Sequence, residues 1–409
     1  RKGFEKEQDI VDVWFDSGVS HFAVLEGNEE LTWPCDLYLE GTDQYRGWFQ
    51  TSIITSVAVT GFPPMKQILT HGFVVDQDGR KMSKSLGNVI EPAEIVEKYG
   101  AEILRAWVVS ADFTQDMKIS EELLKYVIDS YRKLRNTLRF LLANLYDYPV
   151  SAEAPVGYMR EIDRWILHQW SITAQQVHRA YSGYEFHQVY RLLHQFCVVQ
   201  LSSFYLEAIK DRLYVYPAQS AERRAAQFVL SIILNGLLGF LAPILSFTAE
   251  EAYQNLPYKK EDVPSIFLTP FPGTAEEWLN AELEKKWEDV LWLRRKANQL
   301  LEKAKEADIK EPLDAVLTIY AGPPWSEWLA TFSRDELEEI FGTSGVTVLS
   351  ISDFSEEIKE WMVKEEGLIM AVEKAGGKKC ARCWKRYPSV GESEEYPELC
   401  SRCLKWIIS

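Results

Sequence analysis

The hydrophobic pattern of the first 112 residues alternates short apolar runs with longer amphipathic segments. Residues 37–39 and 68–75 are apolar runs that predict buried strands, whereas residues 45–59 and 94–108 predict helices. This strand–helix–strand rhythm predicts an α/β region with a parallel sheet, in which ligands bind at the carboxyl ends of the strands. The polar residues that come after the two strands are therefore candidate site residues.

Farther along the chain, apolar positions recur with the 3.6-residue period of an α-helix. Residues 120–145 predict one long amphipathic helix that connects the α/β region to a second, helical region. Residues 156–308 predict an all-α antiparallel bundle, because short breaks rich in Pro, Gly and Ser separate its periodic segments. The uncharged run 225–247 is as long as a membrane span, but polar residues and Pro243 interrupt it, so we assign it to buried bundle helices. The predicted bundle helices are 162–181, 185–212, 221–241, 246–255 and 275–306.

The last hundred residues change pattern twice. Residues 315–320 and 346–351 alternate like strands, and they flank helical segments at 325–332 and 334–341, which predicts a small α/β module. Nothing in this module indicates catalysis. The predicted domains are residues 1–112, 113–155, 156–308, 309–365 and 366–409.

The final predicted domain contains four of the six cysteines of the chain. Two C-x-x-C pairs, Cys380 with Cys383 and Cys400 with Cys403, are separated by 16 residues, which is the spacing of a four-thiolate zinc site. Four thiolates make a closed shell, so we expect one structural ion in a zinc ribbon. Disulfides are the alternative, but clustered thiols are more typical of a reducing, cytoplasmic protein.

The net charge of −16 is opposite to that of a generic nucleic-acid binder, so any RNA contact requires local basic patches. One patch surrounds the cysteine pairs, where basic and aromatic residues are interleaved, a composition that can bind phosphates and stack on bases. A second is a basic stripe on the helix 120–145, for which a solvated helix face is the alternative interpretation. The candidate RNA-contacting residues are Arg132, Arg135, Arg139, Arg382, Trp384, Lys385 and Arg386.

Residues 79–88 read GRKMSKSLGN and come after the predicted strand 68–75. A strand, a glycine-bearing loop with the ammonium groups of Lys81 and Lys84, and then a helix form a plausible phosphate-binding geometry. A solvated basic turn or a phosphorylation site is the alternative interpretation. The loop is not a Walker loop, because no GxxxxGK[ST] pattern occurs in the sequence.

The KMSKS segment resembles the second signature of class I aminoacyl-tRNA synthetases. Residues 12–18 (DVWFDSG) and 39–49 (LEGTDQYRGWF) narrow the resemblance to isoleucyl-tRNA synthetase, and it covers essentially the whole chain. The resemblance implies a monomer that uses Mg-ATP to activate isoleucine and transfers it to isoleucine tRNA. A valyl-type synthetase and a catalytically inactive RNA-binding module with a structural zinc remain alternatives. Since the HxGH signature and the editing domain are missing, we expect a carboxy-terminal piece that is inactive alone.

The same resemblance implies roles for individual residues. Lys84 and Lys81 would stabilise the charge on ATP phosphates, and Glu40 would contact the aminoacyl-adenylate. Trp14 and Trp48 match positions that wall the isoleucine side chain, although either tryptophan is equally compatible with an ordinary core position. The other candidates for binding ATP or the amino acid are Gly41, Asp43, Gln44, His71, Gly72, Met82, Ser83 and Ser85.

Overall fold

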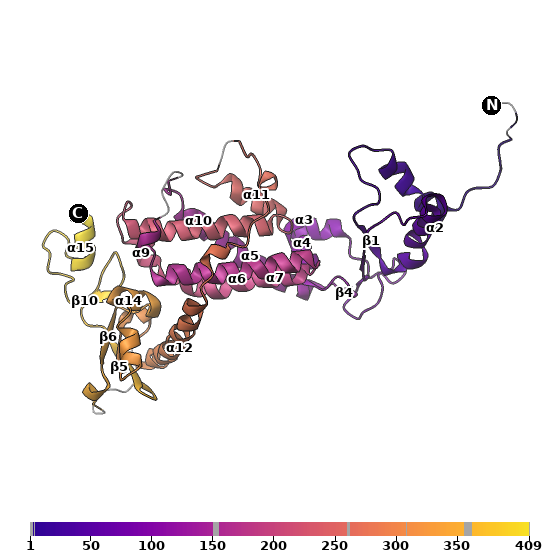
Figure 1. The fold of residues 1–409 in the computed structure, drawn as a ribbon. Helices are drawn as coiled ribbons and strands as arrows, with labels where there is room; N and C mark the ends of the chain where they lie inside the picture. Colours follow the sequence, from indigo (N-terminus) through magenta and orange to yellow (C-terminus); the bar gives the residue numbers. More distant parts are fainter. Residues whose placement is uncertain are drawn as a thin grey trace. The chain divides into compact units, whose positions relative to one another are not determined.

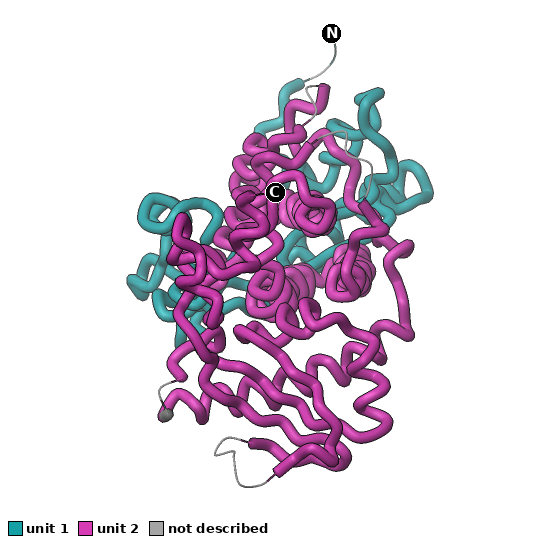
Figure 2. Tube along the Cα trace, turned by 90° about the vertical axis from the view of Figure 1, so that its left-hand side faces the viewer, with its two compact units in different colours: residues 1–128 teal, residues 129–409 magenta. Residues whose placement is uncertain are grey.

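The structure, a computed structural model, describes residues 3, 5–149, 155–259, 262–307, 309–355 and 362–408. The chain divides into two compact units, unit 1 at residues 1–128 and unit 2 at residues 129–409 (Figures 1 and 2). Unit 1 contains the predicted α/β region, and unit 2 contains the helical bundle, a four-stranded sheet and the cysteine cluster. The predicted combination of α/β and all-α parts is therefore confirmed.

Unit 1 is built on two short parallel strand pairs. Strand β1 (Tyr38–Gly41) pairs with β2 (Ile68–His71), and β3 (Val74–Val75) pairs with β4 (Met117–Lys118). The parallel pairing agrees with the rhythm of the sequence, in which a helix connects successive strands. The helical segments of this unit are α1 (Val13–Gly18), the π-helix η1 (Phe22–Glu26), the 3-10 helix η2 (Thr42–Arg46), α2 (Trp48–Thr60), α3 (Pro92–Tyr99) and α4 (Ala101–Ser110).

The predicted helix 275–306 is divided into the short η6 and the long α12, and two further predicted helices are also broken in the structure. The segment 94–108 forms α3 and α4 instead of one helix, because Gly100 between them has a φ of 90°, a conformation that favours glycine. The segment 185–212 is also divided, since Phe196–Tyr205 winds as a wider π-helix, η4. The pieces of this second segment are α7 (Phe186–Gln195), η4, α8 (Leu206–Ala208) and α9 (Lys210–Tyr214). Apolar periodicity alone does not distinguish these short variants from one continuous α-helix.

The long helices of unit 2 bury apolar faces against one another, as expected for a bundle. The helix α10 is long and apolar enough to cross a membrane, but 78% of its most apolar window is buried inside the structure, as in a core helix. Where α10 packs on α6, Gly236 leaves room for the buried ring of Trp170. The long helices are α5 (Glu121–Asn144, of which residues from 129 belong to unit 2), α6 (Glu161–Ser182), α10 (Ala221–Leu241), α11 (Ser246–Gln254) and α12 (Ala281–Ala304). The short 3-10 helices are η3 (Val156–Tyr158), η5 (Ile266–Leu268), η6 (Glu276–Trp278), η7 (Lys305–Ala307), η8 (Pro312–Asp314) and η9 (Ile351–Asp353).

A four-stranded sheet in unit 2 has the strand order β6-β5-β8-β7. The predicted strands at 315–320 and 346–351 are its parallel pair β5 and β6, and β8 runs antiparallel to β5. The sheet also takes strands from 362–374, on both sides of the boundary that the sequence places after residue 365. Its strands are β5 (Ala315–Ala321), β6 (Gly345–Ser350), β7 (Met362–Glu365) and β8 (Leu368–Lys374), with helices α13 (Trp325–Leu329) and α14 (Arg334–Phe341) between β5 and β6.

Candidate functional sites: a strand-end site, a lysine loop and a four-cysteine cluster

The first candidate site lies at the carboxyl ends of β1 and β2. The parallel register places Gly41 opposite His71, and Glu40 immediately precedes Gly41 on β1. A Cβ atom on Gly41 would lie 2.6 Å from Asp43 Oδ1 and 3.5 Å from His71 Cε1, so both polar side chains crowd this glycine. The structure therefore brings Glu40, Gly41, Asp43 and His71 together, as strand topology predicts. Gly72 follows His71 at the carboxyl end of β2, and its backbone N–H donates to the Phe113 carbonyl at 2.8 Å.

Gln44 connects this group to the two tryptophans. Its Oε1 accepts from the Trp48 backbone N–H at 3.1 Å, and its Nε2 donates to Asp43 at 3.3 Å. The Trp14 ring packs against Gly47, where a Cβ atom would approach it to 2.8 Å. Trp14 is 43% exposed, so its ring offers free apolar surface beside the polar group.

The ring of Trp48 is fixed by a stacking contact and a hydrogen bond. Its ring stacks on Tyr38 with 4.2 Å between centroids, and its Nε1 donates to the Ser17 carbonyl at 3.0 Å. The half-buried ring therefore belongs in part to the small core of unit 1 that Tyr38, Phe49 and Met65 form. Both interpretations of Trp48, core residue and pocket wall, are compatible with this position.

The lysine loop, residues 81–85, is braced by a carboxylate that the sequence pattern did not single out. Buried Asp76 accepts hydrogen bonds from the Asn88 Nδ2 and the Arg80 Nε, each at 2.9 Å, and from the Arg80 backbone N–H. These interactions, with that of Asn88 first, lower the pKa of Asp76 to about 2. Asn88 also accepts from the Ser83 backbone N–H at 2.9 Å, so the two side chains join both ends of the loop. Residues 76–79 (DQDG) are typical of a turn, and this is the sequence signal that could have indicated the role of Asp76.

Within the loop, the two lysines have different surroundings. Lys81 places its Nζ 3.9 Å from the centroid of the Phe73 ring, whereas Lys84 lies on the exposed part of the loop. Ser83 and Ser85 approach each other through their hydroxyls at 3.1 Å, and the Met82 side chain is partly buried. In the described part of unit 1, no hydrogen bond or ion pair joins residues 81–85 to the strand-end group.

The four-cysteine cluster is the third candidate site, and its thiols fit one metal ion. Cys380, Cys383, Cys400 and Cys403 are all buried, and their sulfurs lie within 4.8 Å of one another. The Cys383 and Cys400 sulfurs are 3.8 Å apart, the separation expected for two tetrahedral Zn–S bonds of about 2.3 Å. All six cysteines of the chain are free, so the disulfide alternative is wrong for this structure. The strands β9 (Lys378–Lys379) and β10 (Arg386–Tyr387) and the helix α15 (Ser401–Ile408) complete this zinc ribbon.

The ribbon residues that the sequence predicts to contact RNA differ in their exposure to solvent. Trp384 is 62% exposed and has a φ of 63°, so the turn after Cys383 presents its ring to solvent. Lys385 corrects the sequence prediction. It is only 5% exposed, and its ammonium pairs with Glu338 at 2.8 Å, so it is a structural cation and not a phosphate contact. Arg386 pairs with Asp314 at 2.7 Å, and Arg382 donates to the Val215 carbonyl at 2.7 Å.

The predicted basic stripe on α5 is present on the surface of unit 2. Arg132 and Arg139 are exposed, whereas Arg135 makes two hydrogen bonds to Glu251, at 2.7 and 3.2 Å. These hydrogen bonds raise the pKa of Arg135 above its ordinary value. A groove of about 290 Å³ runs beside Arg135 and Arg139, between α5 and α11. Arg132 and Arg139 therefore remain the better candidates for contact with phosphates.

Comparison with protein families identifies each of these parts. The family described as tRNA synthetases class I (I, L, M and V) matches residues 1–120, which include the strand ends and the lysine loop. The anticodon-binding domain of tRNA ligase matches residues 163–319, and the zinc finger found in FPG and IleRS matches residues 377–405. The matched families thus place residues 1–120 among class I tRNA synthetases and residues 163–319 among the anticodon-binding domains of tRNA ligases.

Curated relatives narrow this class to one family. The chain is 45% identical over 407 residues to the isoleucine–tRNA ligase of Caldanaerobacter subterraneus subsp. tengcongensis, covering 99% of the chain and 43% of the relative. It is 46% identical to that of Natranaerobius thermophilus, covering 98% of the chain and 43% of the relative. The chain belongs to the isoleucine–tRNA ligase family, and it spans less than half the length of these relatives.

Solved structures resemble the chain at the level of the fold. A leucyl-tRNA synthetase of Agrobacterium radiobacter K84, in a ternary complex with tRNA and LeuAMS, aligns with a TM-score of 0.56 and 19% identity, covering 68% of this chain and 34% of that chain. The methionyl-tRNA synthetase of Mycobacterium tuberculosis in complex with methionyl-adenylate aligns with a TM-score of 0.51 and 18% identity. The alignment covers 65% of this chain and 55% of that chain.

Proposed function

We propose that this chain takes part in the ATP-dependent activation of isoleucine to isoleucyl-adenylate and in the transfer of isoleucine to isoleucine tRNA. The observation that carries the proposal is 45% to 46% identity to isoleucine–tRNA ligases over 98% to 99% of the chain. Unit 1 would supply the KMSKS part of the active site, and unit 2 the tRNA-binding surfaces. A cytoplasmic location and a monomeric state belong to this proposal.

In the first step, a carboxylate oxygen of isoleucine attacks the α-phosphorus of Mg-ATP, and the bond to the bridging oxygen of pyrophosphate breaks. The carboxylate is already a nucleophile, so the step needs no general base. Catalysis then depends on positioning the reactants and on neutralising the charge that develops on the phosphates. The exposed ammonium of Lys84 is suited to this task, and Lys81 supports it from its place against Phe73.

The strand-end group would hold the other parts of the substrates. Glu40 and Asp43 offer carboxylates to donors on the adenylate, and His71 offers a ring nitrogen beside them. Trp14, with its exposed ring, would face the branched side chain of isoleucine. In the second step, a hydroxyl at the 3′ end of the tRNA attacks the carbonyl carbon of the adenylate, AMP leaves with the electrons of the broken C–O bond, and the hydroxyl proton is released to the departing phosphate or to solvent.

Zinc would act in this scheme only through structure. The four thiolates leave no open coordination position, so the ion would hold the ribbon in shape while the side chains of the chain itself contact the tRNA. Trp384 is suited to stack on an exposed base, and Arg132 and Arg139 are suited to bind phosphates. Arg386 and Arg382 are secondary candidates, because each is already engaged inside unit 2.

The partner is tested by measuring binding of isoleucine tRNA and valine tRNA to the zinc-loaded chain at moderate salt. We expect a clear preference for isoleucine tRNA. Equal affinities that fall steeply with salt would contradict the proposal, because they indicate that basic residues bind phosphates without recognition of tRNA identity. That result would favour the alternative of a generic RNA-binding module.

The chemistry is tested with Lys84→Ala in a protein of the relatives' full length that carries this sequence. We expect isoleucine-dependent pyrophosphate exchange to fall by about 10²-fold or more, the usual effect of removing one group that stabilises transition-state charge. Binding of isoleucine itself should change little, since Lys84 would face the phosphates. Unchanged pyrophosphate exchange in the variant would contradict the role of Lys84.

A further inference from the structure

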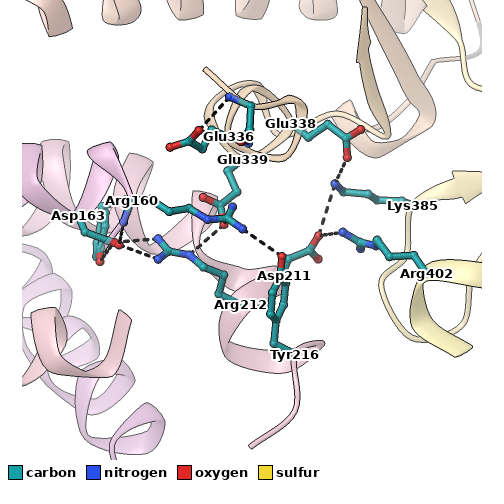
Figure 3. Close-up of polar contacts among 12 residues, drawn as sticks. Arg160, Asp163, Asp211, Arg212, Tyr216, Glu336, Glu338, Glu339, Lys385 and Arg402 are labelled. Carbon is teal, nitrogen blue, oxygen red and sulfur yellow. Dashed lines mark hydrogen bonds and ion pairs between the residues drawn. The ribbon is translucent and has the colours of Figure 1, made fainter. Parts of the chain in front are cut away.

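Unit 2 contains two adjacent clusters of buried and partly buried ion pairs where the bundle, the helix α14 and the zinc ribbon meet (Figure 3). They share two elements, because α9 contributes the neighbours Asp211 and Arg212, and α14 contributes the neighbours Glu338 and Glu339. Each cluster combines two cations with two carboxylates. The inner cluster consists of Arg160, Asp163, Arg212 and Glu339, and the outer cluster consists of Asp211, Glu338, Lys385 and Arg402.

The inner cluster fixes α14 to the bundle. Arg212 is fully buried and makes two hydrogen bonds to Asp163 on α6, at 2.7 and 2.8 Å, while its Nε lies 2.9 Å from Glu339. Burial by itself raises the pKa of Asp163, but Arg212 and the hydroxyl of Tyr205 reverse this effect and hold the pKa below its ordinary value. Asp163 therefore remains charged, and the inner cluster contains no residue of the zinc ribbon.

The outer cluster differs, because both of its cations come from the zinc ribbon. Lys385 lies two residues after Cys383, and Arg402 lies between Cys400 and Cys403. Arg402 Nη1 is 2.8 Å from Asp211 Oδ2, and Lys385 Nζ reaches the same oxygen at 3.4 Å. Each cysteine pair thus carries one cation to a single carboxylate of the bundle.

Asp211 is also the first residue of a short segment, 211–216, that receives the ribbon. The carbonyl of Val215 accepts the hydrogen bond from Arg382, and the Val215 side chain is buried among the four cysteines. The ring of Tyr216 stacks on Trp406 with 5.1 Å between centroids. Apolar, aromatic and ionic contacts of the ribbon therefore converge on α9 and the two residues that follow it.

We propose that Asp211 is a positioning residue that anchors the zinc ribbon to the bundle and thereby orients the exposed ring of Trp384 for RNA. The cations that engage Asp211 are correctly placed only when the two cysteine pairs are folded around one ion, so metal binding is transmitted to the RNA-binding surface through this carboxylate. The RNA part of this inference rests on the proposed function, whereas the anchoring part does not.

The anchoring part is tested by hydrogen exchange in the zinc-loaded chain with Asp211→Asn, which keeps the shape of the side chain but removes its charge. We expect faster exchange of amides in 211–216 and in the ribbon, with four thiols still protected from a thiol reagent by zinc. The matched control is Glu311→Gln, which removes the exposed ion pair of the ribbon residue Lys379, and its ribbon amides should exchange as in the wild type. Wild-type exchange in Asp211→Asn would overturn the inference.

If Asp211→Asn does not fold, Glu338→Gln replaces it. This variant removes the nearer carboxylate partner of Lys385 and leaves Asp211 in place, so the same amides should exchange faster. Ribbon exchange unchanged in Glu338→Gln would then overturn the inference.

The RNA part is tested by the affinity of the same variants for isoleucine tRNA. We expect Asp211→Asn to weaken binding of the tRNA about tenfold. This change in affinity corresponds to the loss of one stacking contact between a base and an aromatic ring. A loosened ribbon with unchanged affinity would overturn the positioning role. If the wild type binds no tRNA, the proposed function fails, and the exchange experiment still decides whether Asp211 anchors the ribbon.

Discussion

At the scale of single residues, Asp76 shows how one carboxylate shapes the lysine loop. Its pKa of about 2 lies below the ordinary value of 3.8, so its hydrogen bonds stabilise the loop fully above about pH 4. This contribution is lost as the pH falls from about 4 to about 2, because protonation weakens the interactions with Asn88 and Arg80. A carboxyl pKa near 3.8, measured by NMR titration of Asp76, would contradict this expectation.

A variant tests the same residue at neutral pH. Asp76→Asn should make the loop more sensitive to trypsin after Lys81 and Lys84, since the charge-assisted bonds to Arg80 are lost. Asp78→Asn is the matched control, because it removes only an exposed ion pair to the same arginine. Equal cleavage rates in both variants would show that Asp76 does not brace the loop.

Residue roles were predictable from sequence only where a local motif carries them. The lysines of KMSKS and the four cysteines are recognisable from their spacing. The burial of Lys385 could not be predicted from the sequence, because its partner Glu338 lies 47 residues earlier and belongs to another element. A basic residue beside an aromatic one has the same appearance in sequence whether it meets RNA or a carboxylate of its own chain.

At the scale of elements, the contact between α6 and α10 depends on the absence of a side chain. A Cβ atom on Gly236 would lie 2.3 Å from the Trp170 ring, which is buried. Alanine is intrinsically better than glycine in a helix by about 1 kcal/mol, but overpacking of a core costs about 1–3 kcal/mol. We therefore expect Gly236→Ala to lower the free energy of unfolding.

Urea unfolding of unit 2 measures this effect as a lower midpoint with an unchanged slope. Gly157→Ala is the control, since nothing lies within 4 Å of a Cβ atom there, and its midpoint should stay within the range of a neutral surface change. A midpoint of Gly236→Ala at or above that of the wild type would mean that the helices separate easily to admit the methyl group.

Most elements were predictable because long amphipathic helices and alternating strands carry strong periodic patterns. The predicted 221–241 coincides with α10, and 334–341 coincides with α14. The division of 94–108 and 185–212 was not predicted. These breaks depend on the backbone conformation of Gly100 and on the packing of η4, which leave the apolar period nearly unchanged.

At the scale of the whole molecule, the ribbon and the bundle should respond differently to loss of metal. The buried core of the ribbon is small and is built around the four cysteines, and a four-thiolate ion commonly supplies the folding free energy of such a module. We expect a chelator to unfold the ribbon, residues 377–405, and to expose four reactive thiols, while the helical circular dichroism of the bundle persists. Cooperative melting of the bundle on chelation would contradict this independence.

The sequence by itself determined the local chemistry and the class of fold: the KMSKS loop, the zinc-binding spacing of the cysteines, the bundle helices and the parallel strands. These features depend on neighbours within a few turns of chain, so residue order is sufficient to specify them. Only the tertiary structure decided which charges are available to a partner. It paired Asp211 with Arg402 and Asp163 with Arg212, because burial of a charge requires an opposite charge that only folding can bring from a distant segment.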